Sequence, residues 1–520
     1  MSVGRTAQAA LNAVEERPWP VAVFLAALYV LGVARTATRP LWCDELFTYY
    51  IAKSATWDHF AFGILHIDLN PPLQHILTLG ALRLFGDSPL ATRLPSIVCF
   101  LIASLLLYRI ALRRLGTCYA AAVVLLFWAS PWFYLATEAR PYALQIACFA
   151  GAFLAWRQAA EGKNRTAALW CLFACVSGML WSHCFALFLL VPFGIAELAR
   201  WRQRRAPDWA VGLVFVSSCA LALPLYLLLV KNALATIHPP QLVTNWSRLG
   251  LIYAMAVCRP TVLAVLFLTV LVALRPYVRA RAYPGSLPGC ERAFLGAVFL
   301  IPLCLHLAFL RSQSPFYLRY AIGYGFFAVL LAGAVLHRFA RRDLLCAATA
   351  AIALILTVGY DAVGPQGTAP IGSAYRPAAA DPWYRQVRPD LPFVCAGGFT
   401  FTEMNQRESP QFLSRVYYLE DHESALNTAH VSIFEFFSVL LPYIGGKAQL
   451  EPYRTFTREH RQFLVLGSRT SVLDWLLPKL AADGAALKKV DERPTGYLDQ
   501  TLFEVTMPET PAYSFNLSRK

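Results

Sequence analysis

Two adjacent carboxylates, Asp44 and Glu45, follow the first long apolar segment of the chain in the sequence Trp42-Cys43-Asp44-Glu45. They are therefore expected where a hydrophobic helix leaves the bilayer. Neighbouring carboxylates repel each other and an interface offers them little solvation. A carboxylate held there can act as a general base towards a hydroxyl group. The alternative interpretation is an ordinary cap of an interfacial helix.

Further ionisable and polar residues occur beside apolar segments, where charge is costly and a functional role is the default interpretation once the group faces a protein cavity. The guanidinium fork suits phosphate, so Arg140 and Arg319 are candidate ligands of a lipid phosphate. The candidate substrate-binding residues are Asp68, Asn70, Glu138, Tyr142, His183 and Tyr320. For each residue alone, the competing interpretation is ordinary: a helix-end arginine that snorkels, or a hydrogen-bonded core histidine.

A divalent cation is a competing role for the acidic residues. Carboxylates are hard oxygen ligands that suit Mg²⁺, Mn²⁺ or Ca²⁺, and the metal-ligand candidates are Asp44, Glu45, Asp68 and Glu138. Their spacing is not diagnostic, so the sequence leaves a metal requirement open.

The elements that position these residues are predicted to be membrane-spanning helices. The chain has 520 residues, is 57% hydrophobic and 15% charged, and has a mean hydropathy of +0.48. A hydrocarbon core roughly 30 Å thick needs about 20 apolar helical residues, and we expect about eleven such spans. The period-two alternation of a membrane barrel is absent. The spans are predicted at 19–36, 90–111, 118–135, 142–159, 167–182, 184–199, 208–230, 260–276, 293–310, 321–337 and 344–360.

The distribution of lysine and arginine predicts the orientation. Every second loop is basic, and cytoplasmic loops carry such an excess. The N-terminus is therefore predicted to be cytoplasmic, and everything after residue 360 extracytoplasmic, as expected for a bacterial inner-membrane protein. All the candidate site residues then fall on the external side. The net charge of +15 is explained by these loops, so nucleic acid is not expected as a partner.

Three domains or segments are predicted: a transmembrane catalytic domain over 1–360, a linker over 361–390, and a small α/β domain over 391–520. The external loop 37–89 is expected to contain two interfacial helices, 44–62 and 72–85, separated at Asn70-Pro71-Pro72. A second external loop, 231–260, contains an amphipathic run at 249–257. The C-terminal domain is expected to contain strands at 391–396, 415–419, 462–466, 487–490 and 501–505, and a helix at 471–482.

The chain resembles the GT-C type of polyprenyl-phosphate-sugar glycosyltransferases, in the branch of aminoarabinose transferases, protein O-mannosyltransferases and bacterial membrane mannosyl- and arabinosyltransferases. The resemblance extends over about residues 20 to 340. The residues that carry it are Asp44-Glu45, Asp68, Asn70-Pro71-Pro72-Leu73, Phe85-Gly86-Asp87-Ser88, Arg93-Leu94-Pro95-Ser96, Glu138-Ala139-Arg140-Pro141-Tyr142 and Arg319-Tyr320. It implies that Asp44 activates the acceptor as a general base, with Glu45 assisting, and that the sugar is transferred in one displacement with inversion. Many relatives have His or Lys before the proline pair, where this chain has Asn70.

The predicted function is thus transfer of a sugar from a polyprenyl-phosphate donor to a hydroxyl of a glycan, lipid or protein, with the lipid bilayer as a further partner. The alternative is a transporter or flippase of a lipid-linked anion, which would use the arginines for binding and the carboxylates as proton relays. Against it, the spans have few charges near mid-bilayer, and no repeated half with broken helices is evident. A third interpretation makes the C-terminal domain a docking module anchored by the membrane part.

Overall fold

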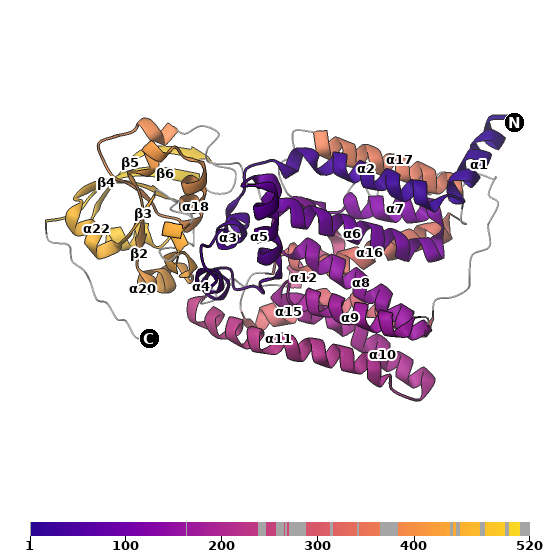
Figure 1. Ribbon diagram of the computed structural model, residues 1–520. Helices are drawn as coiled ribbons and strands as arrows, with labels where there is room; N and C mark the ends of the chain where they lie inside the picture. Colours follow the sequence, from indigo (N-terminus) through magenta and orange to yellow (C-terminus); the bar gives the residue numbers. More distant parts are fainter. Residues whose placement is uncertain are drawn as a thin grey trace. The chain divides into compact units, whose positions relative to one another are not determined.

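The computed structural model describes residues 2–162, 164–237, 246–255, 265, 268–269, 288–312, 316–340, 343–363, 383–436, 440–443, 448–467, 474–494 and 499–509. The chain forms two compact units (Figure 1). The first comprises Met1–Arg39, Asn70–Tyr226 and Gln241–Thr368. The second comprises Pro40–Leu69, Leu227–Pro240 and Ala369–Lys520, so most of the first external loop belongs with the C-terminal residues.

The first unit is helical. Its helices are α1 (Ser2–Glu15), α2 (Pro18–Ala37), α5 (Leu73–Phe85), α6 (Pro89–Leu115), α7 (Thr117–Trp128), α8 (Tyr142–Glu161), α9 (Arg165–Leu180), α10 (Leu190–Arg204), α12 (Trp246–Met255), α14 (Gly289–Val298), α15 (Leu300–Ser312), α16 (Ile322–Phe339) and α17 (Leu344–Val363). Helix α11 (Trp209–Thr236) begins in this unit and ends in the second. Helices α6, α7, α8 and α9 pack side by side along their lengths (Figure 1).

Six helical segments are long and apolar enough to cross a membrane, and they coincide with six predicted spans. They are Pro18–Ala37, Pro89–Leu115, Cys184–Arg204, Trp209–Thr236, Gly289–Leu310 and Leu318–Phe339. Shorter apolar helices, among them Thr117–Trp128, Arg165–Leu180 and Leu344–Gly359, occupy other predicted positions. The predicted span 260–276 lies almost wholly outside the described residues, as do residues 238–245 of the second external loop. The number of spans stays a prediction.

A buried arginine joins the end of the first span to the start of the second. Arg93, in the first turns of α6, is fully buried, and its Nη1 donates hydrogen bonds to the carbonyls of Ala37, at 3.1 Å, and Arg39. Carbonyls at the end of a helix have no partner within it, so the guanidinium satisfies groups that α2 leaves open. Ser88 caps α6 by accepting a hydrogen bond from the Ala91 amide at 3.1 Å.

The interior of the helical unit is aromatic. Phe149, Phe153, Phe193, Phe294 and Phe327 come from α8, α10, α14 and α16, and neighbouring ring centroids lie 4.7 to 5.9 Å apart. Offset and edge-to-face pairs at these distances stabilise a core beyond their buried area. This cluster holds together helices that are far apart in the sequence.

Several basic residues of the loops predicted to be cytoplasmic form ion pairs in the helical unit. Asp208 accepts from Arg165 at 2.5 Å and from Arg200 at 2.6 Å, and Arg157 lies 3.0 Å from Glu291. These pairs join the ends of α8, α9, α10, α11 and α14. The basic residues of these loops therefore also connect helix ends through ion pairs.

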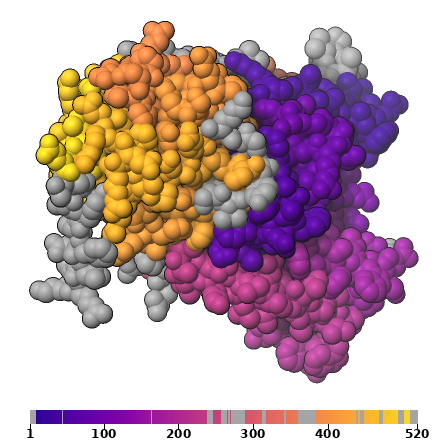
Figure 2. Space-filling view, turned by 60° about the vertical axis from the view of Figure 1, so that its left-hand side comes forward, coloured from indigo at the N-terminus to yellow at the C-terminus, as the bar shows by residue number. Residues whose placement is uncertain are grey.

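The second unit contains a six-stranded sheet in the order β3-β2-β1-β4-β6-β5. Strands β1 (Phe393–Cys395), β2 (Val416–Glu420), β3 (Gln449–Pro452) and β4 (Gln462–Gly467) are parallel, whereas β5 (Ala486–Pro494) and β6 (Asp499–Thr506) are antiparallel. The helices around the sheet include α18 (Gly398–Arg407), α22 (Tyr453–Glu459) and α23 (Leu476–Ala482). Figure 2 shows the residues after 383, orange to yellow, gathered into one body. The predicted small α/β region is confirmed.

Two details of the second unit differ from the sequence prediction. The predicted helix 44–62 is two helices, α3 (Cys43–Ala52) and α4 (Trp57–Phe62), because Thr56 accepts a hydrogen bond from the His59 amide and starts a new helix. Strand β3 was not predicted, since its sequence Gln-Leu-Glu-Pro has no apolar alternation. The predicted helix 471–482 is described from Leu476 onward, as α23, and residues 468–473 lie outside the described chain.

A buried carboxyl group in this unit predicts a pH-dependent stability. Glu435 is 2% exposed, and its Oε1 accepts from the Tyr418 hydroxyl at 3.0 Å and from the Trp475 indole at 3.2 Å. Burial is the main cause that raises its pKa from 4.5 to about 7. Because the folded state binds this proton more tightly than the unfolded state, its stabilisation is complete below pH 4.5. It is lost as the pH rises to 7.

The expected decrease in the free energy of unfolding over that pH interval is about 3 kcal/mol at most. We therefore expect the melting temperature of the purified protein to fall between pH 5 and pH 8, and the Glu435→Gln variant to show a shallower fall. Glu423→Gln, which changes an exposed carboxylate, should keep the wild-type slope. Equal slopes in all three proteins would show that Glu435 does not take up a proton in this range.

Candidate active site

Helix α3 begins with the two predicted catalytic carboxylates in its first turn. Glu45 is fully buried, and its Oε2 accepts a hydrogen bond from the Trp42 amide at 3.2 Å. This bond satisfies a donor at the start of the helix, so Glu45 acts as a cap. Asp44 is only half-buried. The geometry thus gives Glu45 a role in capping α3, whereas Asp44 is partly exposed to solvent.

The turn that carries Asp68 is packed against α3. Helix α4 continues directly into a π-helical turn, η1 (Gly63–Asp68), in which Asp68 is 9% exposed. A Cβ atom on Gly63 would lie 2.7 Å from Cγ1 of Ile51, so glycine permits this close approach. Leu69 then adopts a left-handed conformation, with φ of 55°, and reverses the chain before the proline pair. Asp68 and the Asp44 pair are therefore carried by adjoining elements of one unit.

Helix α18 of the C-terminal sheet region packs on α3, a contact that the sequence did not predict. The Tyr50 hydroxyl donates to the carbonyl of Thr402 at 2.9 Å and accepts from Asn405 Nδ2 at 3.4 Å. Arg407 Nη2 donates to the carbonyl of Leu41 at 2.5 Å. Leu41, two residues before α3, and Tyr50, near its end, are thereby both held by α18.

Arg407 also lies in the electric field of the carboxylates around α3. It is largely buried and pairs with Glu403 at 3.6 Å, and burial lowers its pKa while the charges of Glu403 and Glu45 oppose that shift. An arginine paired with carboxylates away from water orients them as well as neutralising them. No motif in the sequence indicates a role for Arg407, because it lies in a polar helix without a recognisable pattern.

The Arg407→Met variant is expected to lower the catalytic rate constant about tenfold to a hundredfold by displacing α3, since a shift of about 1 Å in a reacting group has such effects. Arg407→Lys, which keeps the charge, should recover part of the activity. The measurements are kcat and KM of glycosyl transfer, with exposed Arg454→Met as the control. A change in KM alone would point to substrate contact instead of positioning.

In the helical unit, Arg319 is surrounded by tyrosines. It lies in the 3₁₀ turn η4 (Leu318–Ala321), directly before α16. Its guanidinium carbon is 4.9 Å from the ring centroid of Tyr317, 5.6 Å from that of Tyr320 and 6.0 Å from that of Tyr142. Aromatic faces attract a cation and hold the planar guanidinium in place. This arrangement suits the binding of an anionic group by a guanidinium that is held in one orientation.

His183 lies beside the same tyrosines. Its ring centroid is 5.2 Å from that of Tyr142 and 5.9 Å from that of Tyr320. Nδ1 accepts a hydrogen bond from the Phe185 amide at 3.0 Å, and the His183 carbonyl accepts from the Tyr226 hydroxyl at 3.0 Å. Because Nδ1 is an acceptor, the neutral imidazole carries its proton on Nε2. His183 is thus fixed in orientation and offers a donor.

Glu138 and Arg140 lie in the tight segment before α8 and are 1% and 7% exposed. The amide of Arg140 donates to the carbonyl of Glu138 at 2.7 Å, and the carbonyl of Arg140 accepts from Ser96 Oγ at 3.2 Å. Gln74 Nε2 in turn donates to Ser96 Oγ at 3.3 Å. Residues of α5 and α6 therefore hold the segment that places Tyr142, at the start of α8, beside Arg319.

The structure brings together Tyr142, His183, Arg319 and Tyr320, as predicted for a binding site. The start of α5 adjoins this region of the chain, because the Leu73 amide donates to the carbonyl of Trp181 at 3.1 Å. The predicted site residues of the helical unit are Asn70, Glu138, Arg140, Tyr142, His183, Arg319 and Tyr320. Those of the second unit are Asp44, Glu45 and Asp68. Their convergence on one pocket stays a prediction, as does a cation held by the carboxylates.

Comparisons with known proteins agree with these features. Residues 70–227 match the family model described as dolichyl-phosphate-mannose-protein mannosyltransferase. The chain is similar to the crystal structure of ArnT from Cupriavidus metallidurans in the apo state, with 15% identity, 93% of this chain and 97% of that chain covered, and a TM-score of 0.50. It is likewise similar to the structure of that protein bound to undecaprenyl phosphate, with 16% identity, 94% and 98% coverage and a TM-score of 0.50.

No curated protein sequence matches the chain. The family match and the shared fold confirm the predicted resemblance to the GT-C glycosyltransferases. They also confirm the predicted multi-pass helical architecture with a small C-terminal sheet.

Proposed function

We propose that this chain, a multi-pass membrane protein with the fold of the GT-C glycosyltransferases, transfers a sugar from a polyprenyl-phosphate donor to an acceptor hydroxyl group. The observation that carries the proposal is Arg319 within its group of tyrosines, in a fold shared with a protein described as bound to undecaprenyl phosphate. The acceptor is a glycan, a lipid or a protein. The sugar is a hexose or a pentose.

The donor phosphate is assigned to the arginines. A polyprenyl phosphate keeps its chain in the bilayer and its charged group at the interface, where arginine forks bind phosphate in a bidentate manner. Arg319, held over the rings of Tyr142 and Tyr320, supplies such a fork at a helix start. Arg140, which is buried three residues after the 3₁₀ turn η2 (Phe133–Thr137), supplies the second. The apolar helices around them suit the isoprenoid chain.

The reaction is a single displacement at the anomeric carbon. The carboxylate of Asp44 accepts the proton of the acceptor hydroxyl as its oxygen forms a bond to the anomeric carbon. The bond between that carbon and the phosphate oxygen breaks, and its electron pair leaves with the polyprenyl phosphate. The arginines stabilise the negative charge that grows on the leaving phosphate. Attack from the face opposite the leaving group inverts the anomeric configuration.

The site is assigned to the extracytoplasmic side of a bacterial inner membrane, with the N-terminus in the cytoplasm. The support is the alternation of basic loops, whose residues cluster near the ends of α8 and α10, whereas Arg39, Lys53 and Arg83 are spread along the loop 37–89 that contains Asp44. Cysteine labelling at exposed Ala55 and at exposed Arg204 tests this assignment. An impermeant reagent should modify Ala55→Cys in intact cells and leave Arg204→Cys unmodified.

Mass spectrometry of lipid that co-purifies with the protein tests the donor, because a retained phospho-sugar identifies donor and class together. The purified protein should then transfer that sugar to an acceptor in detergent. Proteoliposome assays separate this activity from transport. Movement of a lipid-linked anion across the bilayer without sugar transfer would overturn the proposal in favour of a flippase.

A further inference from the structure

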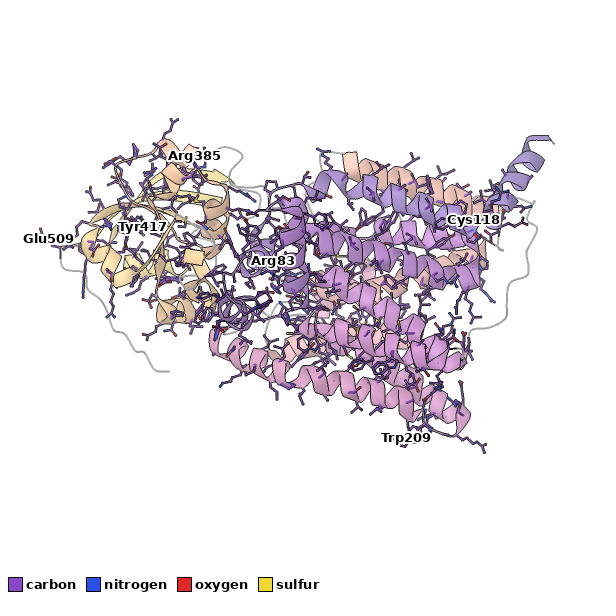
Figure 3. The ribbon with its side chains drawn as sticks, in the orientation of Figure 1. Arg83, Cys118, Trp209, Arg385, Tyr417 and Glu509 are labelled. Atoms are coloured by element: carbon purple, nitrogen blue, oxygen red, sulfur yellow. The ribbon has the colours of Figure 1, made fainter. Side chains whose placement is uncertain are left out.

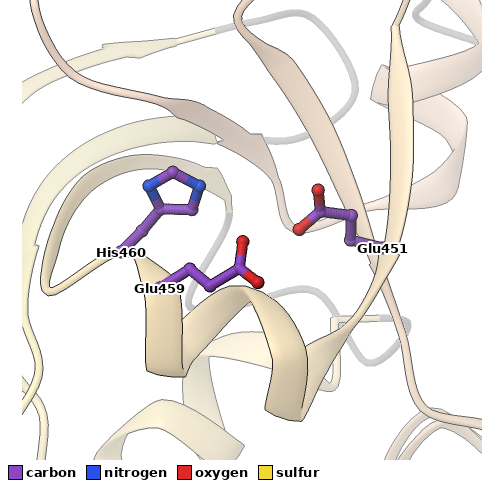
Figure 4. Close-up of side chains that lie close together, drawn as sticks. All are labelled: Glu451, Glu459 and His460. Carbon is purple, nitrogen blue, oxygen red and sulfur yellow. The ribbon is translucent and has the colours of Figure 1, made fainter.

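A group of three potential metal ligands lies on the sheet region, remote in sequence from every predicted site residue. Glu451 belongs to β3, Glu459 is the last residue of α22, and His460 follows it. One ligand atom of each side chain lies within 4.8 Å of the others, and the three side chains point towards a common space (Figure 4).

The backbone fixes both sides of this group. Glu451 is paired in register with Leu419 of the neighbouring strand β2. The His460 amide donates to the carbonyl of Phe456 at 2.8 Å, so the histidine ends α22 in a defined place. Its ring centroid lies 4.6 Å from that of Phe456 and 5.9 Å from that of Tyr417. The imidazole is thereby oriented by aromatic packing, as metal-binding imidazoles commonly are by their surroundings.

The charges of the group favour a cation. Two carboxylates lie beside one imidazole, so the group has an excess of anionic ligand atoms. Among the described residues, Glu451 Oε2 accepts no hydrogen bond although it is shielded from solvent. Tyr417, on the adjoining strand β2 and labelled in Figure 3, packs beside His460. The carbonyls at the end of α22 add negative potential.

We propose that Glu451, Glu459 and His460 bind a divalent transition-metal ion of the Zn²⁺ class. An imidazole nitrogen with two carboxylate oxygens suits Zn²⁺ and its neighbours in the first transition row, whereas Mg²⁺ and Ca²⁺ prefer oxygen ligands alone. Ligand bonds of about 2.0 to 2.2 Å require the ligand atoms to approach one another to roughly 3.5 Å, which rotation of the side chains provides. Three protein ligands leave a fourth position for water.

The site is independent of the proposed glycosyl transfer. It links the end of α22 to β3, so an ion bound there stabilises the folded state, which alone brings the three ligands together. The competing explanation is that His460 is protonated and balances the two carboxylates without a metal. Zinc binding and its loss in single variants separate these two explanations.

The test uses the purified full-length protein in detergent, stripped with a chelator and titrated with ZnCl₂ against a chromogenic zinc indicator. We expect the wild type to bind one equivalent more than Glu451→Gln and His460→Gln, and its melting temperature to rise by several degrees with zinc. Glu423→Gln, which changes an exposed carboxylate of the same region, should bind zinc and respond like the wild type.

Equal zinc stoichiometry in the wild type and in both ligand variants would overturn the proposal, as would a wild type that takes up no zinc. If a ligand variant fails to fold without metal, the visible absorption spectrum of the wild type loaded with Co²⁺ tests the proposal instead. Absorption in the visible range typical of a tetrahedral nitrogen and oxygen site supports the proposal, and a spectrum of hydrated Co²⁺ contradicts it.

Discussion

Replacing Asp44 by asparagine is expected to lower the rate constant of glycosyl transfer by about 10²- to 10⁴-fold, the usual contribution of a positioned general base. Asparagine has nearly the same shape but cannot accept the proton of the acceptor hydroxyl. Asp44 is half-buried at the start of α3. KM for the donor should change little, because the donor phosphate is assigned to other residues.

Two neighbouring variants make this result specific. Glu45→Gln keeps an acceptor oxygen for the Trp42 amide and should lose less activity than Asp44→Asn, since Glu45 caps the helix. Asp58→Asn changes an exposed carboxylate in the first turn of α4 and should be as active as the wild type. Equal and substantial activity of Asp44→Asn and the wild type would remove Asp44 from the mechanism.

Replacing Arg319 by alanine is expected to lower kcat/KM for the donor by about 10²- to 10³-fold, because it removes a cation that stabilises the leaving phosphate. Arg319→Lys should restore only part of this loss. Lysine keeps the charge, but it lacks the planar fork that binds phosphate and stacks on Tyr317 and Tyr320. The measurement is initial rate against donor concentration, together with competition by free polyprenyl phosphate.

The matched control is Arg338→Ala, which removes an exposed arginine from the last turn of α16, the helix that follows Arg319. It should retain wild-type kinetics and the same affinity for polyprenyl phosphate. If Arg319→Ala keeps full affinity and rate, the group of tyrosines is a packing feature and the donor phosphate binds elsewhere. A loss of folding is detected separately, by the melting temperature of each variant.

The helical architecture was accessible from the sequence because long apolar runs have one physical solution in a bilayer. Segments such as Pro18–Ala37 and Trp209–Thr236 satisfy most of their backbone hydrogen bonds within themselves, so composition alone defines them. The strands of the C-terminal region were predicted for a similar reason, since Phe393–Cys395 and Gln462–Gly467 are buried and apolar. Strand Gln449–Pro452 was not, because neighbouring strands and not its own residues stabilise it.

The residue types of the candidate site could be predicted from the sequence, but the contacts that hold these residues in place could not. Four residues predicted from the sequence lie in one cluster in the structure: Tyr142, His183, Arg319 and Tyr320. The contacts of α18 with α3 had no sequence signal, since Arg407 lies more than 360 residues from its acceptor at Leu41. No local pattern encodes a hydrogen bond across that distance.

Hydropathy and motifs were enough to predict a membrane protein of many helices, the charged residues beside its apolar segments, and the family that these residues resemble. These properties are local, because hydropathy and motifs depend on neighbouring residues along the chain. The folded structure was needed to find that Glu45 caps its helix, that tyrosines surround Arg319, and that Glu451, Glu459 and His460 lie close together. Such contacts depend on how distant elements pack, and packing is a property of the whole fold.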